Sequence, residues 1–564
     1  MLPATLHRWF PFLAWPRPDR ALLQGEFWAG LTVGLMLVPQ GVAYAALAGM
    51  PLVTGIYASL LPGLVAVLWG SSTRLGVGPT ALTSLLIGTS LSGLAAPGSA
   101  QWVSLAVWMA LLSGALQLVL GLVRFGWLLN LVTSPVLSGF TQAAALLILA
   151  SQLPGLVGLR ASLAELVNTP GLQHFDLAGA AMGLGSVVAL WLARKQWPRF
   201  PAVIVVMGAA ALLSKAIGYA DNGGAVVGLL PSGLPHPYWP GALPWSTLGA
   251  LVMPVLVITL VSFLETASSA KVDHQSSGTR WNENQDLMAH GLAKISSGLC
   301  GAFATSASFS RSAVNLYAGA RTGWASVFSC ALVLVALLWL TPALHHVPQS
   351  VLAAVVVMAI TGLIQPSTLR RLWRISRVEA SISATTFVIT LATAPYLYWG
   401  VLVGLLMNLS HYLYQRLHPR IIEVGLHPDG SLRDRQLWQL PPLAPDLLAL
   451  RMDAELDFAS ASALERSVAD RMAARPGLAH VCLFAQPINR VDVTGVETFA
   501  RLLALVLRQD CTLHISGLKL PIEQVLERAG VLTPGPKLRM YRTDSDALQA
   551  LRQMQEPSAQ VHSG

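Results

Sequence analysis

Apolar runs recur from about residue 28 to residue 415, and they constrain the fold more than any other feature of this chain. We place fourteen membrane-spanning segments at 28–47, 53–70, 79–94, 102–122, 131–152, 174–193, 200–219, 247–270, 286–302, 309–320, 322–341, 349–364, 378–394 and 396–415. Several are shorter than the ~20 residues that a helix needs to cross a bilayer alone. A chain that is 54% hydrophobic and 11% charged is typical of a polytopic membrane protein.

Basic residues between the runs predict the orientation of the chain in the membrane. The inward loops carry most of them: Arg74, Arg124, Arg194, Lys195, Arg199, Lys271, Arg280, Arg321, Arg370, Arg371, Arg374 and Arg377. The outward loops hold little beyond Arg160, with Lys215 near the outer end of one span. This alternation predicts an even number of spans with both termini cytoplasmic, and it explains the net charge of +9 without nucleic-acid binding.

The third and tenth runs are short and interrupted by small residues. The third begins at Arg74-Leu75-Gly76-Val77-Gly78-Pro79-Thr80, and the tenth lies in Ala304-Thr305-Ser306-Ala307-Ser308-Phe309-Ser310-Arg311. Broken segments at matching positions of two halves predict an inverted repeat of seven plus seven spans, with a site between half-helix N-termini. Thr80 would then face Ser310, and Arg311 would face a cavity or a partner and not lipid. The alternative is an ordinary cytoplasmic loop that carries a positive-inside arginine.

Charged residues become frequent after residue 435, where apolar runs shorten to about six residues. We expect strands at 447–452, 480–485 and 511–516 and helices at 460–474, 495–507 and 520–529. Their alternation indicates a small α/β domain. The predicted organisation is therefore a cytoplasmic segment (1–27), a transmembrane domain (28–420), a soluble domain (435–555) and a disordered tail (556–564).

Ordered motifs along the chain resemble the SulP anion transporters, the sulfate permease family. They are Gly30-Leu31-Thr32-Val33-Gly34, Val38-Pro39-Gln40-Gly41-Val42-Ala43-Tyr44-Ala45, Gly55-Ile56-Tyr57-Ala58-Ser59, Gly78-Pro79-Thr80-Ala81-Leu82, Phe263-Leu264-Glu265 and Ser308-Phe309-Ser310-Arg311-Ser312-Ala313-Val314-Asn315. The C-terminal domain resembles the STAS domain of that family, with Asp492-Val493-Thr494-Gly495 at its signature loop.

The resemblance implies a core domain (spans one to four and eight to eleven) that moves as an elevator against a gate domain formed by the other spans. It also implies a homodimer. The anion site that it implies lies between the third and tenth half-helices and is lined from the first span. The corresponding residues here are Gln40, Tyr44, Thr80, Ala81, Phe309, Ser310 and Arg311.

Glu265 is a carboxyl group within an apolar span, where it needs a cation partner, a bound cation or a proton. The resemblance associates this position with cation coupling. The alternative is a structural ion pair of Glu265 with Arg311 or Lys294. Lys294 is a second intramembrane cation, which would either extend to the interface or alter the charge of the cavity.

We therefore predict a proton-coupled secondary transporter of a bacterial inner membrane, with sulfate and bicarbonate as leading substrates and a dicarboxylate third. A sodium-coupled bicarbonate symporter and an uncoupled channel or exchanger are the alternatives. We expect no enzyme activity, no cofactor and no metal site, because four scattered cysteines and the pair His345-His346 form no ligand set. Asp492 and Thr494 are candidate regulatory residues, since the resemblance places them at a phosphorylation switch of related domains.

Overall fold

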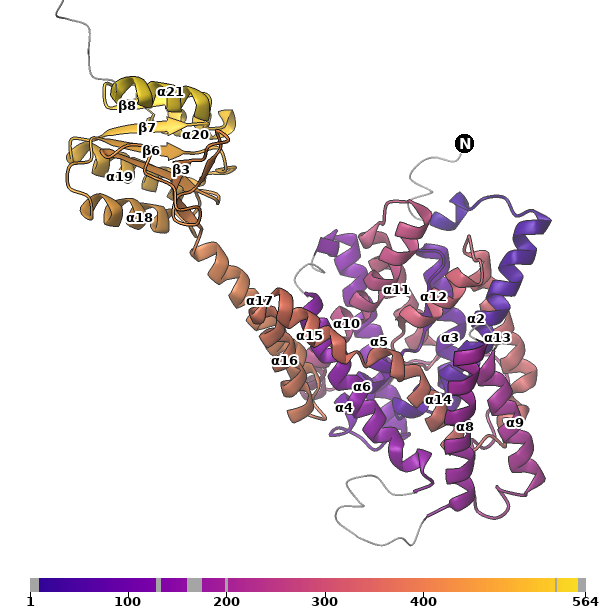
Figure 1. The fold of residues 1–564 in the computed structure, drawn as a ribbon. Coiled ribbons are helices and arrows are strands. Elements are labelled where there is room, and N and C mark those ends of the chain that lie inside the picture. Colours follow the sequence, from indigo (N-terminus) through magenta and orange to yellow (C-terminus); the bar gives the residue numbers. More distant parts are fainter. Residues whose placement is uncertain (1–9, 128–132, 160–174, 198–200, 533–534, 556–564) are drawn as a thin grey trace, which may run out of the picture. The chain divides into compact units, whose positions relative to one another are not determined.

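The computed structural model describes residues 10–127, 133–159, 175–197, 201–532 and 535–555. The chain forms two compact units, Met1–Asn408 and Leu409–Gly564 (Figure 1). Arg160, Arg199, residues 1–9 of the N-terminal segment and the tail 556–564 lie outside the described residues.

Helices of different lengths make up most of the first unit. They are α2 (Arg20–Leu47), α3 (Leu52–Trp69), α4 (Ala81–Leu91), α5 (Ala100–Leu122), α6 (Ser134–Leu156), α8 (Leu177–Gln196), α9 (Ala202–Ala216), α10 (Trp245–Ser277), α11 (Glu283–Leu299), α12 (Phe309–Tyr317), α13 (Trp324–Val335), α14 (Gln349–Ile360), α15 (Pro366–Ile375), α16 (Arg377–Ala392) and α17 (Tyr398–Leu417), the last of which continues into the second unit. Short helical turns are η1 (Pro11–Ala14), η3 (Ala336–Leu340), η4 (Thr341–Leu344) and η5 (Thr361–Leu363).

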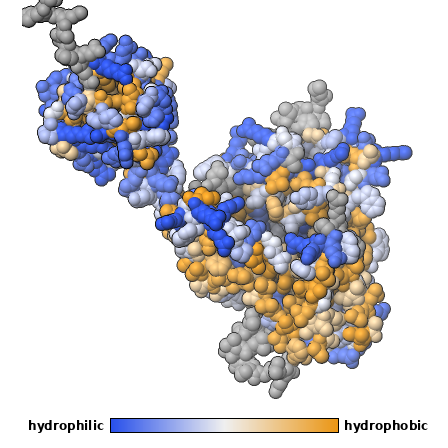
Figure 2. All heavy atoms as spheres, viewed as in Figure 1, coloured by the Kyte–Doolittle hydropathy of each residue, from blue (hydrophilic) through white to orange (hydrophobic). Residues whose placement is uncertain are grey.

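Each of the fourteen predicted spans overlaps one of these helices. Among the described residues, eight helical segments are long and apolar enough to cross a bilayer alone. Figure 2 shows a broad hydrophobic face on this unit, as a surface in contact with lipid requires. The number of crossings itself stays a prediction. Helix α15 lies in what we predicted to be an inward loop, and its buried face includes Leu372.

Two half-helices interrupt this bundle. Helix α4 has eleven residues and α12 has nine, so they rise roughly 16 and 14 Å, about half of the ~30 Å hydrocarbon core. A three-residue strand leads into each: β1 (Gly76–Gly78) into α4 and β2 (Ser306–Ser308) into α12. The strands pair antiparallel, with Val77 opposite Ala307. This pairing brings the two half-helix N-termini together.

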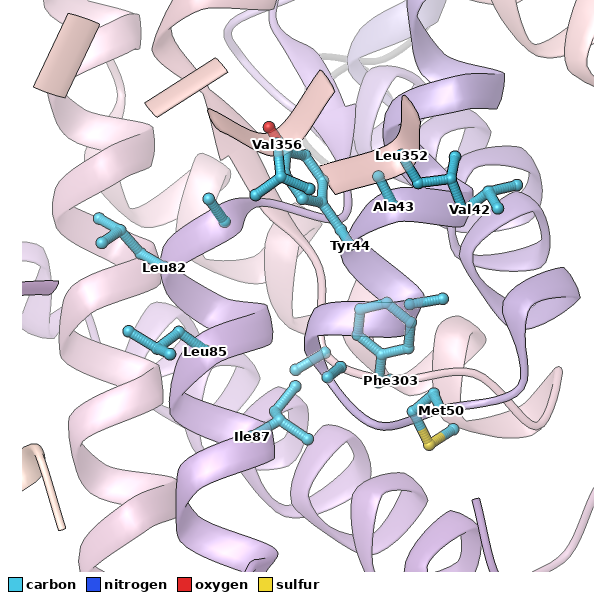
Figure 3. Close-up of a cluster of buried hydrophobic side chains, with 14 of the residues drawn as sticks. Val42, Ala43, Tyr44, Met50, Leu82, Leu85, Ile87, Phe303, Leu352 and Val356 are labelled. Carbon is cyan, nitrogen blue, oxygen red and sulfur yellow. The ribbon is translucent and has the colours of Figure 1, made fainter. Parts of the chain in front are cut away.

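Close packing fixes the helices that carry these strands. A Cβ atom on Gly55 would lie 1.9 Å from the carbonyl oxygen of Gly41, so α2 and α3 touch backbone to backbone. Apolar side chains fill the space around α4 (Figure 3). Those labelled in Figure 3 come from α2, α4, α14, the α2–α3 loop and the segment between α11 and β2: Val42, Ala43, Tyr44, Met50, Leu82, Leu85, Ile87, Phe303, Leu352 and Val356.

The second unit is built on one six-stranded mixed sheet. Its strands are β3 (Ile421–Leu426), β4 (Leu432–Asp434), β5 (Leu447–Met452), β6 (His480–Phe484), β7 (Thr512–Ser516) and β8 (Leu538–Tyr541), and its helices are α18 (Ala461–Ala473), α19 (Val493–Arg508), α20 (Leu520–Arg528) and α21 (Asp544–Gln555). The order is β4-β3-β5-β6-β7-β8, with β5 to β8 parallel and β3 antiparallel to both of its neighbours.

Alternate residues of the strands face opposite sides of this sheet and form a hydrophobic core on each side. Leu448 and Leu450 pack with α18, α19 and α20 on one face. Leu447 and Ala449 pack with α21 on the other face. The three predicted strands and three predicted helices of this domain are present, within two residues at each end. The sheet begins at Ile421, upstream of residue 435, because the β3–β4 hairpin belongs to it.

Candidate functional site

The strand pair β1–β2 places two capped helix N-termini next to each other. Thr80 caps α4 by accepting a hydrogen bond from the backbone N–H of Thr83, and Ser308 caps α12 through the N–H of Arg311. A helix N-terminus carries about half a positive charge and leaves N–H groups free. The paired termini therefore create a region that attracts anions.

A cavity of about 1150 Å³ opens onto these termini. Its wall includes six of the seven residues that we predicted for anion binding, together with the predicted coupling residue: Gln40, Tyr44, Thr80, Ala81, Phe309, Ser310 and Glu265. Phe309 and Ser310 are exposed on the first turn of α12. Gln40 and Tyr44 are one helical turn apart on α2 and present donors from the same face.

Arg311, the seventh residue, lies behind this wall and does not line the cavity. Its side chain is completely buried. Nη1 donates to Oε1 of Gln40 at 3.1 Å, and Nη2 donates to the carbonyl oxygen of Pro79 at 2.9 Å. Arg311 thus contacts hydrogen-bond acceptors and not lipid, because a charged side chain is costly to expose to lipid. Because Arg311 holds the amide oxygen of Gln40, the Gln40 NH2 group is the donor left for the cavity.

Gly76 lets Arg311 approach the strand pair this closely. A Cβ atom on Gly76 would lie 2.6 Å from the Cβ of Arg311, a distance that real side chains do not adopt. Gly76 is therefore needed to place the charged side chain of Arg311 beside the strand pair, and it is not only a loop residue.

Glu265 reaches the same cavity from α10. Its Oε2 accepts a hydrogen bond from Oγ1 of Thr80 at 3.1 Å. No lysine or arginine nitrogen lies within 4.0 Å of this carboxylate among the described residues. The structural ion pair of Glu265 with Arg311 or Lys294 is thus not formed here. A hydrogen bond therefore links Thr80, the N-cap residue of α4, directly to the carboxyl group of Glu265.

Lys294, from α11, is buried beside α5 and α10. Its ammonium nitrogen donates to Oε1 of Gln117 at 2.9 Å and to Oγ of Ser262. Ser306 in turn donates to the carbonyl oxygen of Ser262 at 3.0 Å. Sequence reasoning did not identify Gln117, Ser262 or Ser306, because single polar residues in apolar runs carry no signal of what they contact.

The candidate regulatory residues lie in the second unit. Asp492 caps α19, accepting hydrogen bonds from the N–H groups of Gly495 at 2.8 Å and Phe458 at 3.0 Å. Thr494 is exposed in the first turn of this helix. A hydroxyl at this place is accessible from solvent, whereas Asp492 is occupied in holding the loop.

The sulfate permease family matches residues 23–386, and the STAS domain matches residues 442–547. A chloroplastic sulfate transporter of Arabidopsis thaliana is 30% identical over 577 aligned positions, which cover 97% of this chain and 83% of that protein. A probable sulfate transporter of Mycobacterium tuberculosis is also 30% identical and covers 95% and 96% of the two chains.

Solved structures share the fold. The murine Solute Carrier 26 family member A9 anion transporter in its inward-facing state matches with a TM-score of 0.87 and 20% identity, over 98% of this chain and 95% of that one. The transmembrane domain of a cyanobacterial bicarbonate transporter matches with a TM-score of 0.60 and 19% identity, over 70% and 98%. The half-helices, the cavity and these likenesses lead to one conclusion: the chain is a multi-pass membrane protein of the sulfate permease family with a C-terminal STAS domain.

Proposed function

We propose that this protein is a secondary active transporter of an inorganic anion, with sulfate as the first candidate substrate and bicarbonate as the second. An organic dicarboxylate is the third candidate. The observation that carries the proposal is the cavity bounded by the α4 and α12 N-termini, with Arg311 fixed behind its wall. Relatives that are named sulfate transporters support the ranking.

Binding would use neutral donors in contact with the anion and a positive charge behind them. The Gln40 amide, the Ser310 hydroxyl and the free N–H groups of the half-helices would donate to the anion oxygens. Arg311 would supply charge at a distance and hold Gln40 in place. This division would let the anion leave more readily than a direct salt bridge would.

Transport would couple to a proton on Glu265. A half-buried carboxyl group in a membrane-spanning helix, without a cation within ion-pair distance, has a proton as its simplest partner. The Thr80 hydroxyl, which both caps α4 and contacts Glu265, would link protonation to the end of the anion site. Sodium is the alternative coupling ion.

Alternating access would occur by an elevator movement of the core against the gate. The cavity supports this proposal, because α2, α4, α10 and α12 line one part of it and α6, α8, α9, α14 and α15 line the rest. The first set of helices belongs to the predicted core domain and the second to the predicted gate domain. The exception is α15, which lies in a predicted loop between two spans. A homodimer in a bacterial inner membrane, with both termini and the STAS domain cytoplasmic, completes the proposal.

The test is counterflow uptake by proteoliposomes that contain the purified full-length chain, with labelled sulfate, bicarbonate and fumarate in parallel. We expect uptake of sulfate that an inward proton gradient drives above equilibrium. Accumulation that follows a sodium gradient and not a proton gradient would identify sodium as the coupling ion. Anion current that persists without any cation gradient would identify a channel or exchanger, and no flux of any of the three anions would refute the proposal.

A further inference from the structure

Lys294 is a buried cation for which the proposed cycle has no use. Its side chain is completely buried on α11, and both of its hydrogen-bond partners, Gln117 on α5 and Ser262 on α10, are neutral. No carboxylate oxygen lies within 4.0 Å of its nitrogen among the residues that the structure describes. A charge kept in this place without an ion pair requires a reason, because burial of a charge is costly.

Hydrogen bonds connect Lys294 to the anion site. Ser262, which accepts from Lys294, precedes Glu265 by three residues and so lies on the same face of α10. The carbonyl of Ser262 accepts from Ser306, which lies opposite Gly78 in the β1–β2 pair. Lys294 therefore stands directly behind the strands that carry both half-helix N-termini, and it interacts electrostatically with Glu265.

The other charged and titratable groups near Lys294 are accounted for. Asp286 and His290 lie on the same helix. The Asp286 carboxylate accepts from the backbone N–H groups of Ser71 and Ser72 and from the Trp281 indole, so its charge is satisfied at the end of α3. His290 is buried one helical turn before Lys294. Arg194 of α8 and Arg371 of α15 also line the cavity, but both are exposed and therefore screened by water. The less solvated charges near the half-helix N-termini are those of Arg311, Lys294 and Glu265.

We infer that Lys294 sets a preference of this site for divalent over monovalent anions. The inference rests on the proposed function and narrows its substrate class to dianions such as sulfate or a dicarboxylate. With Glu265 protonated, Arg311 and Lys294 together present two positive charges, which a dianion balances. Without Lys294 the same state presents one, which a monovalent anion balances. Because opposite charges attract strongly in a poorly solvated site, the match in charge decides which anion is held.

Lys294→Gln tests the inference in the purified full-length protein. Isothermal titration with sodium sulfate and with sodium bicarbonate, at one pH and equal ionic strength, gives a Kd for each anion. We expect the Kd for sulfate to rise about tenfold or more, and that for bicarbonate to change by less than about threefold. Lys271→Gln, which removes an exposed lysine of α10, should change neither.

Gln117→Glu provides a second route to the same result. It places a carboxylate where Lys294 now finds an amide oxygen, and so neutralises the cation without removing it. The same selective loss of sulfate binding is expected, and this variant decides the question if Lys294→Gln does not fold. Equal losses for the two anions, or an unchanged ratio of the two Kd values, would overturn the inference. A wild-type protein that transports bicarbonate and not sulfate would also overturn it while anion transport stands, whereas absence of all anion flux would refute the proposed function itself.

Discussion

At the scale of single residues, the proposed anion site has neutral groups on the cavity wall and a buried charge behind them. Gln40 and Ser310 reach the cavity, whereas Arg311 is buried behind Gln40. The sequence could predict that Arg311 avoids lipid, since a charge in an apolar segment must. It could not predict which partner the guanidinium has, because Gln40 and Pro79 lie more than two hundred residues away along the chain.

Arg311→Gln should weaken sulfate binding about tenfold or more and also lower the melting temperature. The variant loses a charge, and it weakens two hydrogen bonds of a charged donor, each worth ~1.5–3 kcal/mol. Arg311→Lys, which keeps the charge, should recover part of the affinity. Titration and thermal unfolding would be measured on all three proteins. Wild-type affinity in Arg311→Gln would exclude any role of this charge in binding.

Glu265→Gln should abolish accumulation driven by an inward proton gradient and spare exchange of anion for anion. The amide imitates a carboxyl group that never releases its proton, and exchange requires no net proton movement. Asp221→Asn, which changes an exposed carboxylate outside the cavity, is the matched control. Both fluxes would be followed in proteoliposomes. If Glu265→Gln still concentrates sulfate against a gradient, the coupling group lies elsewhere.

At the scale of helices and strands, hydrophobic runs were sufficient to place a helix in every predicted span. The pair β1–β2 could not be predicted, because three-residue strands from distant segments leave no pattern of alternation. Helix α15 was missed because its arginines suggested a loop. The β3–β4 hairpin was missed although His427-Pro428-Asp429-Gly430 is a turn signal, and Gly430 adopts a φ of 85° there.

Gly76→Ala tests the close contact between β1 and α12. The added methyl group would lie 2.6 Å from the Cβ of Arg311, so strand or half-helix must shift. Overpacking of this kind costs ~1–3 kcal/mol, and we expect lower stability together with weaker sulfate binding. Gly185→Ala on α8 adds the same group where nothing lies within 4 Å and should leave binding unchanged. Equal behaviour of the two variants in titration and thermal unfolding would contradict the proposed role of this contact.

At the scale of the whole molecule, the two units have separate hydrophobic cores. All proposed anion ligands belong to the first unit, and the last of them precedes Asn315. The division explains why the sequence could predict each unit by itself, from apolar runs in one and from alternating strands and helices in the other.

A protein of residues 1–420 should therefore insert into membranes and bind sulfate with a Kd close to that of the full chain. Fluorescence-detected gel filtration would establish that it is folded before titration. A slower rate or lower yield is compatible with a regulatory or stabilising STAS domain. Loss of binding by a well-folded truncated protein would show that the STAS domain shapes the site.

The most direct test of the account is the protection of Ser310→Cys from a charged thiol reagent by sulfate. The four native cysteines are buried, so the new thiol on the cavity wall is the reactive one. At ten times the Kd about a tenth of the sites are free, and modification should slow about tenfold. Ser232→Cys, at an exposed position outside the cavity, should react equally with and without sulfate. A modification rate of Ser310→Cys that sulfate leaves unchanged, in a protein that still transports it, would contradict the assignment of this cavity as the anion site.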